Sequence, residues 1–201
     1  MGLSKIIVIL GRTASGKTGL GLKLAKKFNG EIVSADSRQI YTKMQIGTAK
    51  PAGVWKKVKG QKMYLVQGIP HHLMDIVDPG EDFSVADYKT LAIKCIKDIL
   101  SRKKLPIIVG GTGLYIQALV ENLDIPQVGP NKELRKHLEK KKPSELAVLL
   151  KKIDPIAAKK IDLQNPRRVL RALEVFILSG ESFFAQKTKP DLKAGADLAW
   201  T

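Results

Sequence analysis

Residues 11–18 read Gly-Arg-Thr-Ala-Ser-Gly-Lys-Thr, which is a complete G-x-x-x-x-G-K-[ST] phosphate-binding loop. An apolar run at 5–10 precedes this loop and a helical pattern over 17–28 follows it, which is the strand–loop–helix context that the motif requires. A plain Gly-rich turn is the weaker interpretation, because both the spacing and the context are right. The motif predicts that the chain binds a di- or triphosphate.

The physical chemistry of the loop gives a role to each of its parts. Glycines let the backbone fold around an anion, so that successive N–H groups and a helix N-terminus point at a phosphate. Lys17 adds a mobile positive charge, and the hydroxyl of Thr18 is a suitable ligand for Mg²⁺. We therefore expect the ligand to be bound by Gly11, Arg12, Thr13, Ala14, Ser15, Gly16, Lys17 and Thr18, with Mg²⁺ at Thr18.

Length and composition indicate a globular protein of the cell interior. The chain has 201 residues, of which 44% are apolar, enough to form a hydrophobic core. Its apolar runs are far shorter than the ~20 residues of a membrane helix, and the first run leads into the phosphate loop instead of forming a signal peptide. The single cysteine, Cys95, excludes an internal disulfide and lies on an apolar stripe, where we expect a core residue. We expect a cytoplasmic monomer without a membrane partner.

Positive charge is large and clustered. The net charge is +16, from 35 Lys and Arg against 19 Asp and Glu. Residues 131–171 alone contain 13 basic and 5 acidic residues, a local excess of +8, and residues 50–62 contain five lysines and no acidic residue. A Lys-rich proteome or simple solubility could explain the total, but clustering favours a polyanionic partner such as RNA.

The first half of the chain alternates between strand and helix patterns. Strands are expected at 5–10, 31–35 and 105–109, and a capping box at 84–87 opens a long helix that ends near residue 102. This alternation predicts an α/β fold of the P-loop NTPase type, a parallel sheet flanked by helices. Ligands bind at the C-terminal ends of such strands, so loops 11–18, 36–39 and 110–112 should converge on one site.

The pattern changes after residue 125. Prolines at 126, 130, 143, 155 and 166 divide the following segment into short basic helices, which predicts an inserted, mainly helical module. Asn165 and Pro166 are a good helix start and Gly180 a plausible stop. We expect an α/β core at 1–125, a helical module that binds the polyanionic partner at 126–164, a helix at 165–187 that returns to the core, and a disordered tail at 188–201.

Two polar residues stand where chemistry is expected. Asp36 directly follows a buried strand beside the phosphate loop, where it could position a metal, act as a general base, or simply cap a turn. Thr112 lies in the Gly-rich turn after the third strand. The pair His71 and His72 does not predict zinc, because adjacent side chains of an extended segment point in different directions. No Asn-Lys-x-Asp motif is present, which argues against a GTPase.

Seven segments, taken in order, resemble one family. They are Gly11-Arg-Thr-Ala-Ser-Gly-Lys-Thr18, Ser34-Ala-Asp-Ser-Arg-Gln-Ile-Tyr41, Ile46-Gly-Thr-Ala-Lys-Pro51, His71-His-Leu-Met-Asp-Ile-Val-Asp-Pro79, Phe83-Ser-Val-Ala-Asp-Tyr88, Gly110-Gly-Thr-Gly-Leu-Tyr115 and Asn165-Pro-Arg-Arg-Val-Leu-Arg-Ala-Leu-Glu174. Each is modest alone, but together they resemble the bacterial tRNA dimethylallyltransferases, the IPP transferase family, from about residue 5 to 187.

The resemblance implies an activity. Family members transfer a dimethylallyl group from dimethylallyl diphosphate to the N6 amine of the adenosine 3′ of the anticodon. It implies that Lys17 and Thr112 belong to the catalytic site and that Asp36 accepts the amine proton. The implied tRNA-binding residues are Asp36, Ser37, Arg38, Gln39, Thr112, Arg135, Arg167, Arg168, Val169, Leu170 and Arg171.

The sequence departs from the family pattern at two points. Arg12 stands where family members usually have proline. The family also continues beyond this point, with an arginine and a Gly-Tyr-Arg-Gln-type motif that help to complete its active site, whereas this sequence ends at Thr201. We therefore expect a C-terminally truncated form that is slow or inactive alone. The alternatives are a small nucleotide or metabolite kinase that binds ATP, and a non-catalytic RNA-binding remnant.

Overall fold

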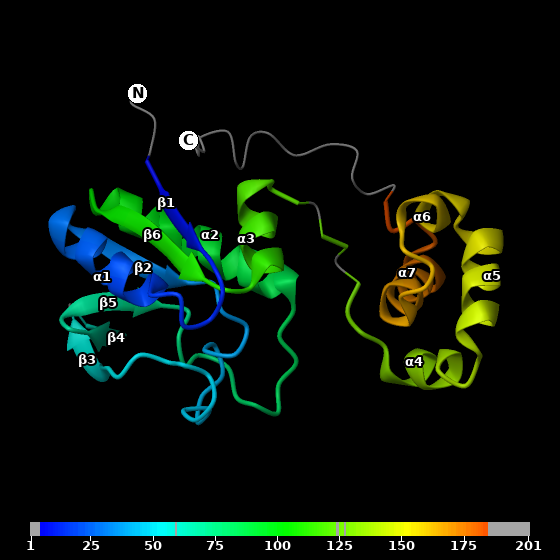
Figure 1. Ribbon diagram of the computed structural model, residues 1–201, viewed down its shortest axis with the longest axis horizontal. Helices are drawn as coiled ribbons and strands as arrows, with labels where there is room; N and C mark the ends of the chain where they lie inside the picture. The colour runs from blue at the N-terminus through cyan, green and yellow to red at the C-terminus, as the bar shows by residue number, and fades with distance from the viewer. Residues whose placement is uncertain (1–4, 59, 124, 127, 185–201) are drawn as a thin grey trace. The chain divides into compact units, whose positions relative to one another are not determined.

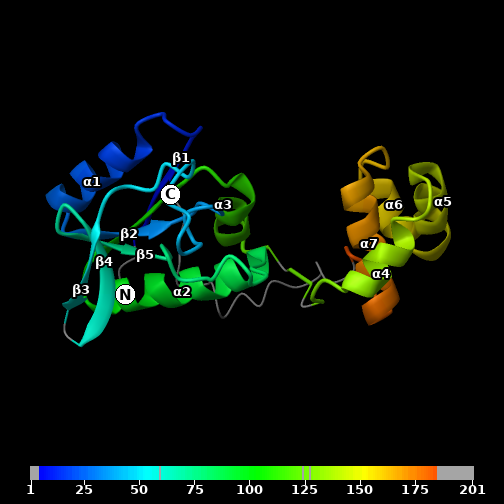
Figure 2. The same ribbon diagram turned by 90° about the horizontal axis from the view of Figure 1, so that it is seen from below.

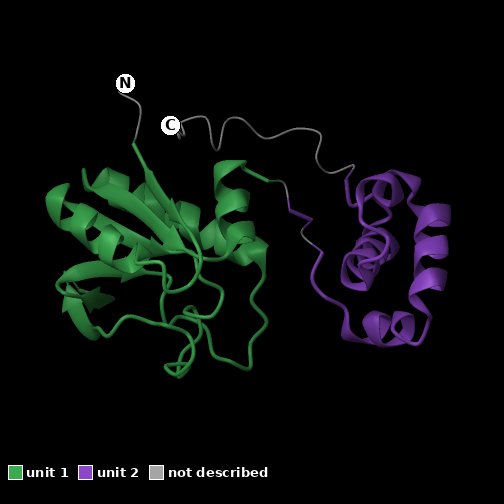
Figure 3. Cartoon of the chain, in the orientation of Figure 1, with its two compact units in different colours: residues 1–123, 191–201 green, residues 124–190 purple. Residues whose placement is uncertain are grey.

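The computed structural model describes residues 5–58, 60–123, 125–126 and 128–184. The chain forms two compact units, an α/β unit and a helical unit, divided after Leu123 (Figure 3). The sequence analysis placed this division two residues later. The expected tail at 188–201 lies outside the described residues.

Within the described residues, a six-stranded sheet forms the centre of the α/β unit, with the strand order β1-β6-β2-β5-β4-β3 (Figure 1). The elements in chain order are β1 (Ile7–Leu10), α1 (Lys17–Lys27), β2 (Gly30–Ser34), β3 (Val54–Val58), β4 (Gln61–Val66), β5 (Ile69–His72), α2 (Val85–Ser101), β6 (Leu105–Gly110) and α3 (Gly113–Val120). β1, β6, β2 and β5 are parallel, so their C-terminal ends meet at one edge of the sheet.

Helices cover both faces of this sheet. Val33 and Ile108 point to the face that α2 and α3 cover, while Ile32 and Ile107 point to the opposite face, against α1. Figure 2 shows α1 and α2 on opposite sides of the strands. Because β6 is buried on both faces, it is a near-continuous apolar run instead of an alternating one. β2 is equally buried but also contains the polar residues Glu31 and Ser34. Cys95 packs against the core on the α2 side, and burial raises the pKa of its thiol to about 11.

The sheet is mixed, which corrects the expectation of an entirely parallel one. β4 pairs antiparallel with both β3 and β5. Gln67 and Gly68 connect β4 to β5 with φ angles of 50° and 81°, as a tight hairpin turn requires. The prediction of an α/β sheet flanked by helices is confirmed, but these three strands were missed because residues 50–62 were interpreted only by their charge.

The helical unit contains α4 (Lys132–Leu138), α5 (Pro143–Ile153), α6 (Pro155–Lys160) and α7 (Pro166–Ser179) among the described residues. Proline opens three of these helices, where its missing N–H is not needed. Three of the five prolines that divide the sequence pattern therefore begin helices. One apolar core joins all four elements: Leu138, Leu146, Leu150, Ala157, Val169, Ala172 and Leu173.

Helix α7 begins and ends as the sequence predicts. The side chain of Asn165 accepts a hydrogen bond from the N–H of Arg168, and Gly180 ends the helix with a φ of 73°. The sequence analysis set 165–187 apart from the helical module. The structure instead groups α7 with that module, because Val169 and Leu173 are buried in its core.

None of the helices in the described part of the chain combines the length and apolar character that crossing a bilayer requires.

Candidate active site

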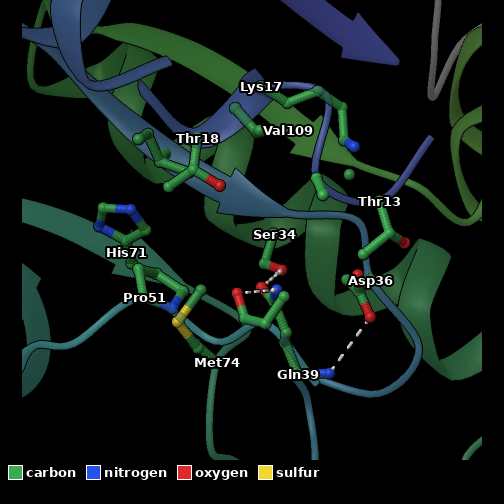
Figure 4. Close-up of a pocket in the computed structure, with 14 residues that line it drawn as sticks. Thr13, Lys17, Thr18, Ser34, Asp36, Gln39, Pro51, His71, Met74 and Val109 are labelled. Carbon is green, nitrogen blue, oxygen red and sulfur yellow. Dashed lines mark hydrogen bonds between the residues drawn. The ribbon is translucent and has the colours of Figure 1, made fainter. Parts of the chain in front are cut away.

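A pocket lies at the C-terminal edge of the parallel strands (Figure 4). The phosphate loop, the segments that follow β2 and β6, strand β5 and the segment 39–51 all contribute to it. Its lining residues are Thr13, Ala14, Lys17, Thr18, Ile32, Ser34, Asp36, Gln39, Ala49, Pro51, His71, Met74, Val109 and Gly110. The structure therefore brings together the three loops that the sequence analysis expected to converge.

The phosphate loop has the backbone that an anion site needs. Gly16 is the N-cap residue of α1, with a left-handed φ of 80°. Because glycine has no side chain, no side chain caps the first N–H groups of the helix. The first N–H groups of α1 are therefore available to an anion. Lys17 Nζ donates hydrogen bonds to the carbonyl of Arg12 and to Ser15 Oγ, so this ammonium group lies over the loop. Of the expected loop residues, Gly11, Arg12, Ser15 and Gly16 do not line the pocket itself.

Asp36 combines a structural role with a position in the pocket. Its Oδ1 accepts hydrogen bonds from the backbone N–H groups of Arg38, at 2.9 Å, and of Gln39, at 3.3 Å. These bonds form a turn, which was one of the alternatives open at the sequence level. They involve only one of the two carboxylate oxygens, so the turn also orients a half-buried carboxylate in the pocket.

Thr112 fixes the turn after β6 to the turn after β2. Its Oγ1 accepts a hydrogen bond from the N–H of Ser37 at 2.9 Å, and its own N–H donates to the carbonyl of Ala35 at 3.1 Å. Gly110 permits this approach, since a Cβ there would lie 2.0 Å from the Ala35 oxygen. Thr112 does not line the pocket, so in this structure it positions the segment that carries Asp36.

The amide of Gln39 holds another wall of the pocket. Its Nε2 donates to the carbonyl oxygens of Thr48 and Ala49, each at 3.2 Å, and its Oε1 lies 3.5 Å from Ser34 Oγ. The side chain that was expected to hold the target base thus holds the segment 48–51. Arg38, by contrast, is exposed.

Sequence reasoning missed a buried ion pair that supports this wall. Lys50 Nζ donates to the Asp75 carboxylate and to the carbonyl of Tyr41, and the two charged side chains are 0% and 9% exposed. The neighbours Pro51 and Met74 line the pocket. The signal was present, because Lys50 and Asp75 belong to two of the family-like segments, but no rule of spacing pairs residues so far apart.

Strand β5 places the two adjacent histidines differently. His71 is 4% exposed, lines the pocket, and donates from Nδ1 to the carbonyl of Ile69 at 3.0 Å. Burial lowers its pKa, and nearby His72 lowers it further, so the imidazole is neutral at neutral pH. The sequence analysis weighed His71 only as a metal ligand and did not anticipate its place in the pocket.

His72 belongs instead to a charged cluster around buried Glu31. Its Nε2 lies 2.7 Å from Glu31 Oε2, and Arg102 and Lys104 also bind this carboxylate. Burial would raise the pKa of Glu31, but these hydrogen bonds outweigh burial and hold it well below its usual range. Within the described residues, no three His, Cys, Asp or Glu side chains are grouped so that they could hold a metal ion.

The arginines of the helical unit have two different roles. Glu174 is 0% exposed and accepts hydrogen bonds from Arg135 and Arg171, as well as from the N–H of Asn131. Burial would raise the pKa of Glu174, but these bonds outweigh it and lower the pKa to about 2. Arg167 and Arg168, on the first turn of α7, are exposed.

Two further residues expected to bind tRNA have positions in the core. Val169 is 1% exposed, and Leu170 is half-buried against the same apolar cluster. Their side chains follow the helical period and face inward, whereas the neighbouring Arg167 and Arg168 face outward. The first turn of α7 thus divides into a core-forming side and an exposed basic side.

Comparison with known proteins identifies the family of the chain. The family model described as IPP transferase matches residues 39–199. A tRNA dimethylallyltransferase of Anoxybacillus flavithermus is 47% identical over 178 residues, which cover 89% of this chain and 54% of that relative. One from Acetivibrio thermocellus is 51% identical over 178 residues, covering 87% of this chain and 54% of its own length.

Solved structures show the same likeness. A full-length tRNA isopentenylpyrophosphate transferase of Bacillus halodurans is 42% identical, with a TM-score of 0.54 over 89% of this chain and 57% of that protein. A eukaryotic dimethylallyltransferase acting on tRNA is 34% identical, with a TM-score of 0.72 over 92% of this chain and 45% of that protein. The chain thus spans about half the length of these relatives. It belongs to the IPP transferase family.

Proposed function

We propose that this chain transfers a dimethylallyl group from dimethylallyl diphosphate to the N6 amine of the adenosine 3′ of the anticodon in tRNA. One observation carries the proposal: the phosphate loop and the Asp36 carboxylate line the same pocket. An anion site beside a base is the pair of groups that this transfer needs, one for the leaving diphosphate and one for the amine proton. The named relatives are dimethylallyl or isopentenylpyrophosphate transferases of tRNA, which supports this proposal.

The phosphate loop would bind the diphosphate. Negative charge grows on this group as the carbon–oxygen bond breaks, and donors that are already in place stabilise such charge best. The first N–H groups of α1 and the ammonium group of Lys17 are donors of this kind. Mg²⁺ fits the site, because the Thr18 hydroxyl lines the pocket and Mg²⁺ commonly combines one or two side chains with substrate phosphates. When bound there, it would neutralise charge on the diphosphate.

Asp36 would accept the proton of the amine. An exocyclic amine of adenine is a poor nucleophile until it loses a proton, and a positioned base can remove one in the transition state. The turn that fixes Asp36 Oδ1 holds the carboxylate in place for this step. Thr112 would act as a positioning residue, through its hydrogen bond to Ser37.

The helical unit would bind the tRNA. Its local excess of +8 over residues 131–171 suits a phosphate backbone. Arg167 and Arg168 are exposed and are the best candidates for phosphate contacts, while Arg135 and Arg171 would contribute mainly by holding the fold. The target base must leave its stack to be modified, which is easier in an anticodon loop than in a duplex. We place this reaction in the cytoplasm and expect a monomer.

The proposal can be tested with two labelled donors. The chain is incubated with an unmodified tRNA and either labelled dimethylallyl diphosphate or γ-labelled ATP. We expect slow transfer of label from the allylic donor to the tRNA. We also expect at least tenfold weaker diphosphate binding by Lys17→Ala, because a charge-assisted contact is lost. Transfer of γ-phosphate would show the kinase alternative to be right. tRNA binding without any transfer, even by a longer form that includes the family's later segment, would favour the RNA-binding remnant.

A further inference from the structure

A buried acceptor in the pocket has no donor. Among the described residues, His71 Nε2 is one of two buried side-chain polar atoms without a hydrogen-bond partner, and the His71 side chain is almost completely buried. The bond from Nδ1 to the carbonyl of Ile69 fixes the tautomer, because a carbonyl can only accept. Nε2 therefore carries the lone pair. Buried polar groups normally have partners, so this nitrogen requires an explanation.

The surroundings of His71 narrow the choice of partner. In Figure 4 its ring lies on the Thr18 side of the pocket, away from Asp36. Ile32, a cross-strand partner of His71, and Met74 line the pocket with it and are apolar. A neutral nitrogen with a lone pair repels phosphate oxygens, so His71 does not suit the diphosphate. It suits a hydrogen-bond donor or a positive charge, and an apolar wall suits a hydrocarbon group.

We propose that the neutral imidazole of His71 is a catalytic residue that stabilises the positive charge developing on the allylic group during transfer. This inference rests on the proposed function, since that reaction places an allylic group next to the phosphate loop. The bond between the first allylic carbon and the diphosphate oxygen breaks, and its electron pair leaves with the diphosphate. The amine nitrogen forms the new bond to the same carbon and gives its proton to Asp36. His71 forms no bond and takes no proton.

The position of His71 in the sheet supports this role. Register pairs His71 with Ile32 on one side and with Tyr64 on the other, so this residue lies on the middle one of three strands. A rigid dipole that is already oriented needs no rearrangement when charge develops, and it acts more strongly away from water. Burial also keeps the ring unprotonated, because it disfavours the charged imidazolium.

The test compares two unreactive diphosphates of the same shape, so that it does not depend on turnover. The first is 2-(dimethylamino)ethyl diphosphate, which carries a tertiary ammonium group in place of the developing cation. The second is 3-methylbutyl diphosphate, whose alkyl group has the same shape but no charge; it is called the uncharged compound below. By calorimetry, we expect the chain to bind the ammonium compound about tenfold more tightly, which is the size of one hydrogen bond to a charged group.

Variants separate His71 from the other groups in the pocket. His71→Leu should bind the uncharged compound as before but lose the preference for the ammonium compound. His71→Gln, which retains a neutral acceptor, should keep part of the preference for the ammonium compound. Thermal unfolding of both variants checks that they are folded. Asp36→Asn measures the share of the preference that comes from the carboxylate. Lys17→Ala should weaken the binding of both compounds by the same factor.

Two results would overturn the role of His71: equal binding of both compounds by the unaltered chain, or the same preference in His71→Leu as in that chain. Failure of both compounds to bind would instead contradict the proposed function and the inference with it. A hydroxylated allylic diphosphate that binds more tightly than both, and loses its advantage in His71→Leu, would show that His71 recognises a hydroxyl group instead of a cation.

Discussion

One carboxylate from each unit, Asp36 and Glu174, shows how differently the same group can be used. In the α/β unit, Asp36 is held by backbone N–H groups of its own turn, and it faces a pocket. In the helical unit, Glu174 is fully buried and is neutralised by two arginine side chains. Asp36 keeps a carboxylate oxygen free of these bonds in the pocket, whereas Glu174 is committed to the fold. The surroundings of each carboxylate therefore decide its role.

The same comparison applies to the arginines. Arg135, Arg167, Arg168 and Arg171 are equivalent in a count of basic residues, but two of them pair with Glu174 and two are exposed. Replacing a paired arginine should therefore affect stability, and replacing an exposed one should affect tRNA binding.

The largest effect is expected at Asp36. Asp36→Asn keeps Oδ1 as an acceptor for its turn but removes the base, so prenyl transfer should fall by about 10²–10⁴-fold while tRNA binding changes little. Single-turnover transfer and gel-shift affinity measure the two properties. Asp36→Glu is a control that keeps the charge but disturbs the turn. Nearly normal transfer by Asp36→Asn would show that another group accepts the proton.

A large loss of stability is expected when Glu174 loses its arginines. Arg135→Met with Arg171→Met leaves an ionised carboxylate buried without a charged partner, which typically costs about 3–5 kcal/mol. Urea unfolding followed by far-UV circular dichroism reports this loss. Adding Glu174→Met should recover much of it, because an apolar replacement of the whole cluster leaves no buried charge. Stability unchanged by the double substitution would contradict the role given to these arginines.

Acid should remove the same stabilisation. The pKa of Glu174 is lowered from 4.5 to about 2, so the folded protein keeps this carboxylate ionised where the unfolded chain protonates it. Its contribution is complete above about pH 4.5 and is lost as the pH falls toward about 2, a change of about 3 kcal/mol. Subtracting the unfolding profile of Glu174→Gln isolates this group from the other carboxylates. Parallel profiles would mean that Glu174 is not the group responsible.

The smallest effect is expected at the exposed arginines. Arg167→Ala with Arg168→Ala should weaken binding of the anticodon stem-loop and reduce the slope of log affinity against log salt by about one unit for each lost phosphate contact. Lys94→Ala with Lys97→Ala removes the same charge from exposed positions of α2 and serves as the matched control. If both pairs change the slope equally, only the total charge matters and α7 is not a specific contact.

Local patterns in the sequence predicted much of the α/β unit. The phosphate loop, the capping box at Ser84, where both reciprocal hydrogen bonds form, and the buried run of β6 depend on residues close together in the chain. The hairpin strands β3, β4 and β5 were missed although Gly68 marked a turn, because lysines on an edge strand resemble a solvated loop. Charge was given more weight than turn geometry.

Contacts between distant segments could not be predicted. The pairing of Lys50 with Asp75, of Glu174 with Arg135, and the bond between Ser37 and Thr112 each depend on the folded arrangement. The sequence therefore indicated which segments form the site and some of the residues that line it, such as Lys17 and Asp36, but not the contacts that hold them. His71 shows the limit most clearly, because only burial reveals that one of its nitrogens has no partner.

The division of roles between the two units can be tested most directly by a double-mutant cycle. It combines Asp36→Asn with the Arg167→Ala and Arg168→Ala pair, and kcat/KM for tRNA is measured in all four proteins. If the α/β unit performs the chemistry and the exposed arginines only bind tRNA, the two effects should add to within about 0.5 kcal/mol. A coupling above about 1 kcal/mol would show that the arginines act on the chemical step, and this would contradict the division.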